Sequence, residues 1–167
     1  MDLFDAVSHS FSTISIGGFS THDASIGYFN STAINIIAAV FLFISGCNFA
    51  LHFSAYFEFG KSNIFKIYFT DPEFKAFLLI QLSLVAICTL SLIGYNHFST
   101  SAEAVEHALF QSISISTTAG FSTSAFDTWP SFLPMLILMA SFIGGCAGST
   151  GGGLKVIRVL LLFVQGR

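Results

Sequence analysis

The sequence has few charged residues. Only 9% are Asp, Glu, Lys or Arg, against about 25% in an average soluble domain. Three long stretches, 24–57, 76–102 and 128–154, contain none of them. About 20 apolar residues are enough to cross a bilayer as a helix. The shortage of charge therefore argues against a soluble domain and favours a membrane protein embedded in a lipid bilayer.

Motifs for metal or redox chemistry are also missing. The three cysteines, Cys47, Cys88 and Cys146, lie in apolar stretches without CxxC spacing, which is typical of buried free thiols. The five histidines form no HxxxH or HExxH pattern. The formal net charge of −3 argues against a nucleic-acid partner. We therefore expect no covalently bound cofactor and no nucleic acid.

The basic residues predict the orientation of the chain. All six fall into two places: Lys61, Lys66 and Lys75, then Lys155, Arg158 and Arg167. Segments 1–30 and 96–130 contain none. Because basic residues mark the cytoplasmic side, the 58–75 loop and the C-terminus are expected inside and the other two segments outside. The first residues are acidic, unlike a targeting segment, and we expect the chain to be a piece of a longer protein.

Two outer segments repeat each other at an offset of 102 residues. Both copies end in Gly-Phe-Ser-Thr, at 18–21 and 120–123. The apolar runs that follow match at an offset of 99, with 44–47 against 143–146. Before each strip, apolar residues recur at helical spacing over a segment too short to span a bilayer. The repeated unit is therefore a re-entrant helix, a polar strip and a long apolar helix.

This unit suits a cation. A half-helix entering from outside points its C-terminus, the negative end of its dipole, at the membrane centre. Carbonyls of an extended strip can replace the hydration shell of potassium, and glycine allows such strips to pack closely. A single Gly-Phe-Ser-Thr would be read as an interfacial turn, but two equivalent copies favour a filter centred on Gly18 and Gly120. The candidate ion-binding residues are Ile16, Gly17, Gly18, Phe19, Thr118, Ala119, Gly120 and Phe121.

The third apolar run predicts a broken helix. Residues 131–143 read as helix, and six glycines follow within 144–153. Glycine costs about 1 kcal/mol in a helix interior, so the helix should break part-way across the membrane and resume over 154–164. Irregular backbone at that depth should line the ion path. The predicted loop comprises Gly144, Gly145, Cys146, Ala147, Gly148, Ser149, Thr150, Gly151, Gly152 and Gly153.

Three charges near these features have two interpretations each. Lys155 follows the glycine segment and either anchors the inner interface by snorkelling or places positive charge at the pore mouth. Asp23 and Asp127 follow the two strips and either concentrate cations at the entrance or are solvated loop carboxylates.

Two motifs resemble a known family. Thr118-Ala119-Gly120-Phe121 resembles a degenerate Thr-Val-Gly-Tyr-Gly potassium-channel filter. The strip 16–20, together with the glycine segment 144–155, resembles the Trk/Ktr/HKT potassium transporter superfamily over essentially the whole chain. The resemblance implies an all-α integral membrane protein built from helix–re-entrant pore helix–filter–helix repeats of the potassium-channel type, four to a chain.

The resemblance also implies a domain organisation. Residues 1–60 would be the second repeat without its first helix, 61–75 a cytoplasmic loop and 76–167 the third repeat. The first and fourth repeats would be missing partners from the same protein. The implied function is passive or weakly coupled (symport) uptake of potassium as substrate, with the glycine loop as an intramembrane gate. A homodimer, a cytoplasmic nucleotide-binding regulatory subunit of the TrkA type, and a multi-pass location in a bacterial inner membrane are further implications.

Other function classes have less support from the residues. A secondary carrier with broken helices would place helix N-termini at its substrate, whereas here C-termini precede the strips. An intramembrane protease could use Ser149 with His52 as base, but the twin strips would go unexplained. The phosphate-binding GxxxxGK[ST] pattern is not matched, since Lys155 follows Leu154. We therefore predict that the protein is not an enzyme.

Overall fold

A computed structural model describes residues 1–59 and 63–166, and this part of the chain is helical without any strand. The prediction of an all-α fold is confirmed. The basic residues Lys61 and Arg167, used above for orientation, lie outside the described residues. In chain order the elements are α1 Leu3–Ile14, η1 Ser25–Phe29, α2 Thr32–Gly46, α3 Phe49–Phe57, α4 Ile64–Thr70, α5 Pro72–Gly94, α6 Ser101–Ser116, η2 Phe126–Thr128, α7 Leu133–Ile143 and α8 Val156–Gln165.

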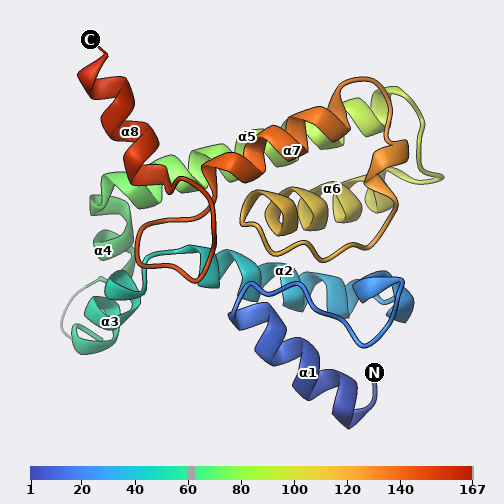
Figure 1. Cartoon of the computed structure of the whole chain (residues 1–167), viewed down its shortest axis with the longest axis horizontal. Coiled ribbons are helices and arrows are strands. Elements are labelled where there is room, and N and C mark those ends of the chain that lie inside the picture. Colours follow the sequence, from blue (N-terminus) through green and yellow to red (C-terminus); the bar gives the residue numbers. More distant parts are fainter. Residues whose placement is uncertain (60–62, 167) are drawn as a thin grey trace.

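Helix α6 lies at the centre of the packing. It contacts α5, α7 and α2, and α1 lies on the far side of α2 (Figure 1). One core cluster joins α5, α6 and α7, with Leu92, Ala108 and Leu133 fully buried. A second cluster contains Phe121 together with Leu42 of α2. Helices α5 and α7 thus pack on α6, whereas α2 covers only one side of α1.

Helix α5 begins with an Asp71 side chain that accepts a hydrogen bond from the N–H of Phe74 at 2.7 Å, and Pro72 occupies the first turn. Among the described residues, it is the one single helix long and apolar enough to cross a membrane, judged by length and composition. Leu79 and Leu90 on its outer face are 70% and 72% exposed. Water would disfavour such a surface, and lipid suits it.

The stretch 32–57 differs from its prediction. The sequence predicts one long apolar helix, but the structure has two, α2 and α3, which meet at an angle of 93°. Cys47 is extended, with φ −81° and ψ 162°, and the side chain of Asn48 caps α3 by accepting from the N–H of Ala50 at 2.9 Å. The carbonyl of Gly46 has left the helical pattern and accepts from Cys146 N–H at 2.9 Å. A hydrogen bond from a distant residue therefore takes the place of the intrahelical bond that this carbonyl would otherwise accept.

The break in the third apolar run is where the sequence predicts it. Helix α7 ends at Ile143, the glycine segment follows without regular structure, and α8 begins at Val156, two residues later than expected. In Figure 1 this segment forms a loop that reaches back from α7 toward the end of α2 before α8 starts. The two breaks, after Gly46 and around Gly145, fall at positions that the sequence repeat aligns.

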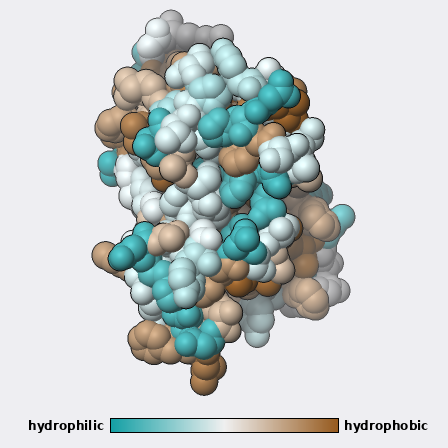
Figure 2. All heavy atoms as spheres, turned by 90° about the vertical axis from the view of Figure 1, so that its right-hand side faces the viewer, coloured by the Kyte–Doolittle hydropathy of each residue, from teal (hydrophilic) through white to brown (hydrophobic). Residues whose placement is uncertain are grey.

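One end of the helical body is largely hydrophilic. Figure 2 views the end where α5 gives way to α6, on the right-hand side of Figure 1, and hydrophilic residues cover much of this face, with apolar residues gathered along its margins. Such a distribution suits a face that meets water and is bordered by lipid.

Candidate functional site

The two strips begin with the same backbone turn. At equivalent positions, Gly17 donates its N–H to the carbonyl of Ser12 and Ala119 to that of Ser114, each at 2.8 Å. These bonds close the C-terminal ends of α1 and α6 in the same way. The sequence repeat is therefore also a repeat of backbone hydrogen bonds.

The backbone angles of the strips repeat as well. Ile16 and Thr118 have φ of 52° and 72°, and Gly18 and Gly120 have φ of 68° and 87°. Ile16 and Thr118 adopt a region that β-branched residues rarely visit, which surrounding structure must hold in place. In each strip, two residues of positive φ flank one whose φ is not positive, so successive carbonyls point in different directions.

The two strips lie against each other at Gly18. A Cβ built on Gly18 would overlap the carbonyl oxygen of Ala119, whereas nothing lies within 4 Å of a Cβ built on Gly120. Glycine is required at position 18 by this contact and by its positive φ. The structure thus brings together candidate ion-binding residues that are about 100 positions apart in the sequence.

Both short helices end at the strips. The last residue of α1 is Ile14 and that of α6 is Ser116. The C-terminal end of a helix carries a partial negative charge from unsatisfied carbonyls. Two such ends directed at one region suit a cation and disfavour an anion.

A pair of side-chain hydrogen bonds ties the outer part of each strip to its short helix. Thr21 donates its hydroxyl to Asp5 Oδ1 at 2.6 Å, and His107 Nδ1 lies 2.9 Å from Thr123 Oγ1. His22 Nε2 lies 3.2 Å from the other Asp5 oxygen. The hydrogen bonds from Thr21 and then His22 lower the pKa of Asp5, so this carboxylate is held ionised.

A second pair lies one helical turn further in. His9 Nε2 is 2.9 Å from Ser20 Oγ, and Gln111 Nε2 donates to Ser122 Oγ at 3.4 Å and to the Ser124 carbonyl at 2.9 Å. We call four contacts the braces: Asp5 with Thr21, His107 with Thr123, His9 with Ser20, and Gln111 with Ser122. The sequence analysis missed all four, although the offset of 102 aligns Asp5 with His107 and His9 with Gln111.

The tip of the glycine loop contacts the ends of both short helices. Thr150 donates its hydroxyl to the carbonyl of Ile14 at 2.9 Å, and the N–H of Gly152 donates to Thr118 Oγ1 at 2.7 Å. A Cβ on Gly151 would lie 2.9 Å from the carbonyl oxygen of Thr117. The predicted loop and the predicted filter are therefore neighbours.

The loop also rests on the broken end of α2. In addition to the bond from Cys146 to Gly46, Phe49 N–H donates to the Gly148 carbonyl at 3.2 Å, and Thr150 N–H to the Ser45 carbonyl at 3.4 Å. These bonds satisfy backbone groups that the break exposes. The bend between α2 and α3 therefore provides the surface on which the glycine loop packs.

The base of the loop is closed on itself. Leu154 N–H donates to the Phe142 carbonyl at 2.9 Å, and Val156 N–H to the Gly145 carbonyl at 3.1 Å. Gly144 has φ of 70°, and a Cβ there would overlap the carbonyl oxygen of Gly152. Only glycine permits this approach of the two arms.

The three charges discussed above take different places. Lys155 follows the loop as the N-cap of α8, has φ of 66°, and donates its ammonium to the carbonyl of Gly151. Asp23 and Asp127 are exposed after their strips. The structure places Lys155 beside the loop tip and leaves both aspartates at the surface.

The serine and histidine weighed for a protease do not form a catalytic pair. Ser149 donates its hydroxyl to the Cys146 carbonyl at 2.6 Å. His52 Nδ1 lies 2.7 Å from the Tyr68 hydroxyl, and Nε2 lies 2.9 Å from the Ile44 carbonyl. Both ring nitrogens are therefore occupied away from Ser149, and His52 instead links α2, α3 and α4.

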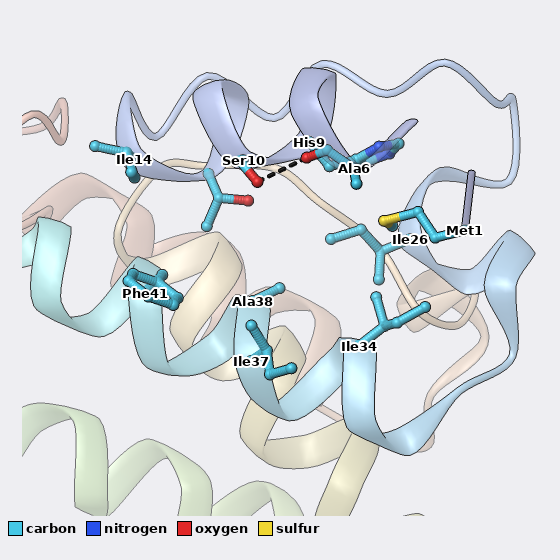
Figure 3. Close-up of a pocket in the computed structure, with 11 residues that line it drawn as sticks. Met1, Ala6, His9, Ser10, Ile14, Ile26, Ile34, Ile37, Ala38 and Phe41 are labelled. Carbon is cyan, nitrogen blue, oxygen red and sulfur yellow. Dashed lines mark hydrogen bonds between the residues drawn. The ribbon is translucent and has the colours of Figure 1, made fainter. Parts of the chain in front are cut away.

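A hollow of about 290 Å³ lies between α1 and α2 (Figure 3). Its walls include Ala6, Ser10, Ile34 and Ala38. In the third repeat the equivalent residues Ala108, Leu133 and Ile137 pack in one cluster with Cys88 and Leu92 of α5, and Ser112 is 1% exposed. The hollow therefore lies where α5 packs against the equivalent residues of α6 and α7. Its mostly apolar lining suits the side of a helix.

A family model described as "TrkH: Cation transport protein" matches residues 1–167. The chain belongs to this family. The Trk system potassium uptake protein TrkH of Vibrio parahaemolyticus serotype O3:K6 is 60% identical over 166 residues, covering 99% of this chain and 34% of that protein. The Trk system potassium uptake protein TrkG of Escherichia coli K12 is 37% identical over 167 residues, covering 100% and 33%.

A solved structure of the TrkH family agrees with the fold. The crystal structure of the potassium transporter TrkH from Vibrio parahaemolyticus superposes with a TM-score of 0.92 at 59% identity, covering 99% of this chain and 35% of that one. The chain spans about a third of the length of these relatives. The resemblance to the Trk superfamily is thereby confirmed. This chain is part of a membrane transport protein and not of an enzyme.

Proposed function

We propose that the chain supplies two of four repeats around a potassium-selective pathway, with the strips 16–19 and 118–121 as two sides of the filter. The observation that carries the proposal is the contact of Gly18 with the carbonyl of Ala119, at the meeting point of two helix C-termini. Backbone oxygens there can replace water around a potassium ion. The relatives are named potassium uptake proteins, which supports potassium as the transported cation.

The proposed organisation keeps the predicted boundaries. Residues 1–60 belong to the second repeat, 61–75 to a cytoplasmic loop and 76–167 to the third repeat. The hollow beside α1 supports this division, because it is where a first helix of the second repeat would pack. In the whole protein, that helix and the first and fourth repeats complete the pathway.

The glycine loop 144–153 is proposed as the gate. Its contacts with Ile14 and Thr118 support a position at the inner end of the filter, where it would obstruct ions until displaced. Lys155 is proposed to add positive charge to this obstruction, since its ammonium meets the loop carbonyl of Gly151. Asp23 and Asp127 are proposed to attract cations to the outer entrance.

The wider assembly follows from the Trk resemblance. We propose a homodimer of complete protomers in a bacterial inner membrane, regulated by a cytoplasmic nucleotide-binding subunit of the TrkA type. Transport would be passive or weakly coupled to a second ion. A carrier of anionic substrates is a weaker candidate, because helix C-termini and not N-termini approach the strips.

The filter is tested by Gly18→Ser and Gly120→Ser in the intact protein, with potassium and sodium flux measured in proteoliposomes. Gly120 has φ of 87°, which a serine adopts only with strain, so Gly120→Ser should displace the backbone carbonyls of its strip and reduce the preference for potassium. Gly18→Ser meets the Ala119 carbonyl and should also lower the folded yield. Wild-type ion preference in folded Gly120→Ser protein would contradict the filter assignment.

A further inference from the structure

Glu73 is a charged residue in an unexpected environment. It lies in the first turn of α5, near the predicted cytoplasmic side, and is 5% exposed. Its neighbours Phe74 and Phe77 pack in one cluster with Cys47, Cys146 and Val156. Among the described residues, no Lys or Arg forms an ion pair with Glu73. A carboxylate is costly to bury unless other groups compensate its charge.

The compensating groups are two backbone N–H donors of the glycine loop and α8. Glu73 Oε1 accepts from Ala147 at 2.7 Å and from Ile157 at 3.1 Å. Ile157 lies in the first turn of α8, where unpaired N–H groups and the helix dipole favour a negative charge. Ala147 lies in the loop just before its tip. A single oxygen therefore joins the entry of the loop to the helix that follows it.

We propose that Glu73 is a positioning residue that latches the glycine loop in its place beneath the strips. This rests on the proposed function of the loop as a gate. The base of the loop is closed by the backbone bonds from Leu154 and Val156, and its tip is held through Thr150 and Thr118. The bonds to Glu73 fix Ala147 and Ile157 to α5, a long helix that is packed along α6. Charge-assisted hydrogen bonds are stronger than neutral ones, so these two bonds hold the loop to α5 more firmly than a neutral acceptor would.

The position of Glu73 also lets a movement of α4 reach the latch. Asp71 is at once the last cap of α4 and the first cap of α5. Tyr68 of α4 packs on Phe74, with ring centroids 5.3 Å apart. A protein that binds the predicted cytoplasmic segment around α4 would thus move the first turn of α5 and withdraw the carboxylate from the loop.

The test uses the intact protein in proteoliposomes, with Glu73→Leu, Glu73→Gln and, as matched control, Glu58→Leu at an exposed carboxylate of the same predicted side. Rubidium influx is measured per folded protein, and hydrogen exchange is followed for peptides within 144–157. Losing one charge-assisted hydrogen bond shifts a local equilibrium by about tenfold or more. We expect Glu73→Leu to raise both exchange and basal influx on that scale, and Glu73→Gln, which keeps an acceptor, to raise them less.

Three results would overturn the latch. One is wild-type exchange in both Glu73 variants. Another is faster exchange with unchanged influx per folded protein, since a merely structural glutamate would lower stability alone. The third is an equal effect in Glu58→Leu. If Glu73→Leu does not fold, Glu73→Gln carries the same test. Absence of potassium or rubidium flux in the wild-type protein would instead refute the proposed function, while exchange would still report on the attachment of the loop.

Discussion

The imidazole ring of His9 is stacked on Phe121, with ring centroids 6.1 Å apart and planes 27° from parallel. The short helix of one repeat therefore supports the strip of the next. Phe121 is fully buried by this contact and by α2, whereas its equivalent, Phe19, is 82% exposed. In the proposed four-repeat protein, a preceding repeat would cover Phe19 as α1 and α2 cover Phe121.

The braces are expected to hold the strips in register. Gln111→Leu removes the hydrogen bonds from Gln111 Nε2 to Ser122 Oγ and to the Ser124 carbonyl, which keeps its bond from the Ser122 hydroxyl. Each lost bond costs about 0.5–1.5 kcal/mol. We predict a lower unfolding temperature of the intact protein in detergent and a weaker preference for potassium over sodium. Gln111→His, which copies His9 of the other repeat, is the control and should retain both properties. Equal behaviour of the Leu and His variants would contradict this role.

The hollow beside α1 is expected to hold a helix in the intact protein. Ser10 is exposed here, while its equivalent Ser112 is buried against α5. Ser10→Trp should therefore overpack the site, at a cost of about 1–3 kcal/mol, and reduce the yield of folded protein on size-exclusion chromatography. Ser10→Ala should leave it unchanged. Full tolerance of tryptophan would mean that the hollow is open in the whole protein.

Shortening the glycine loop should open the pathway. Deleting residues 148–152 removes the contacts with Ile14 and Thr118 but leaves Ala147 and Ile157 available to Glu73. We predict higher potassium influx, weaker dependence on a cytoplasmic partner and unchanged selectivity. Thr150→Val, which loses only the hydroxyl, should act in the same direction more weakly. A deletion variant that folds but keeps wild-type influx and regulation would make the loop structural.

The orientation of the chain can be tested with single cysteines. Lys66 in α4 and Asp23 after the first strip are both exposed, while the native thiols are buried and should react slowly. An impermeant thiol reagent added outside cells should label Asp23→Cys and not Lys66→Cys, as the positive-inside rule requires. Labelling at position 66 alone would reverse the proposed topology.

Much of the fold could be predicted because its signals are local. The absence of charge from three long stretches is enough to indicate a membrane protein, and helical spacing before each strip locates α1 and α6. The glycines of 144–153 break a helix wherever it lies, so that interruption was predicted almost to the residue. The α2–α3 bend was missed because Gly46 and Cys47 alone are compatible with helix.

The sequence by itself determined the repeat, the two glycine strips and the place of the broken helix, since propensity and periodicity act within a few residues. Only the tertiary structure decided which groups meet. Gly46 loses its helical partner because Cys146 supplies another, and Glu73 reaches Ala147 and Ile157 across more than 70 positions. A buried backbone group must be paired, but any donor or acceptor of suitable geometry can pair it. That choice is made by packing, which no local pattern encodes.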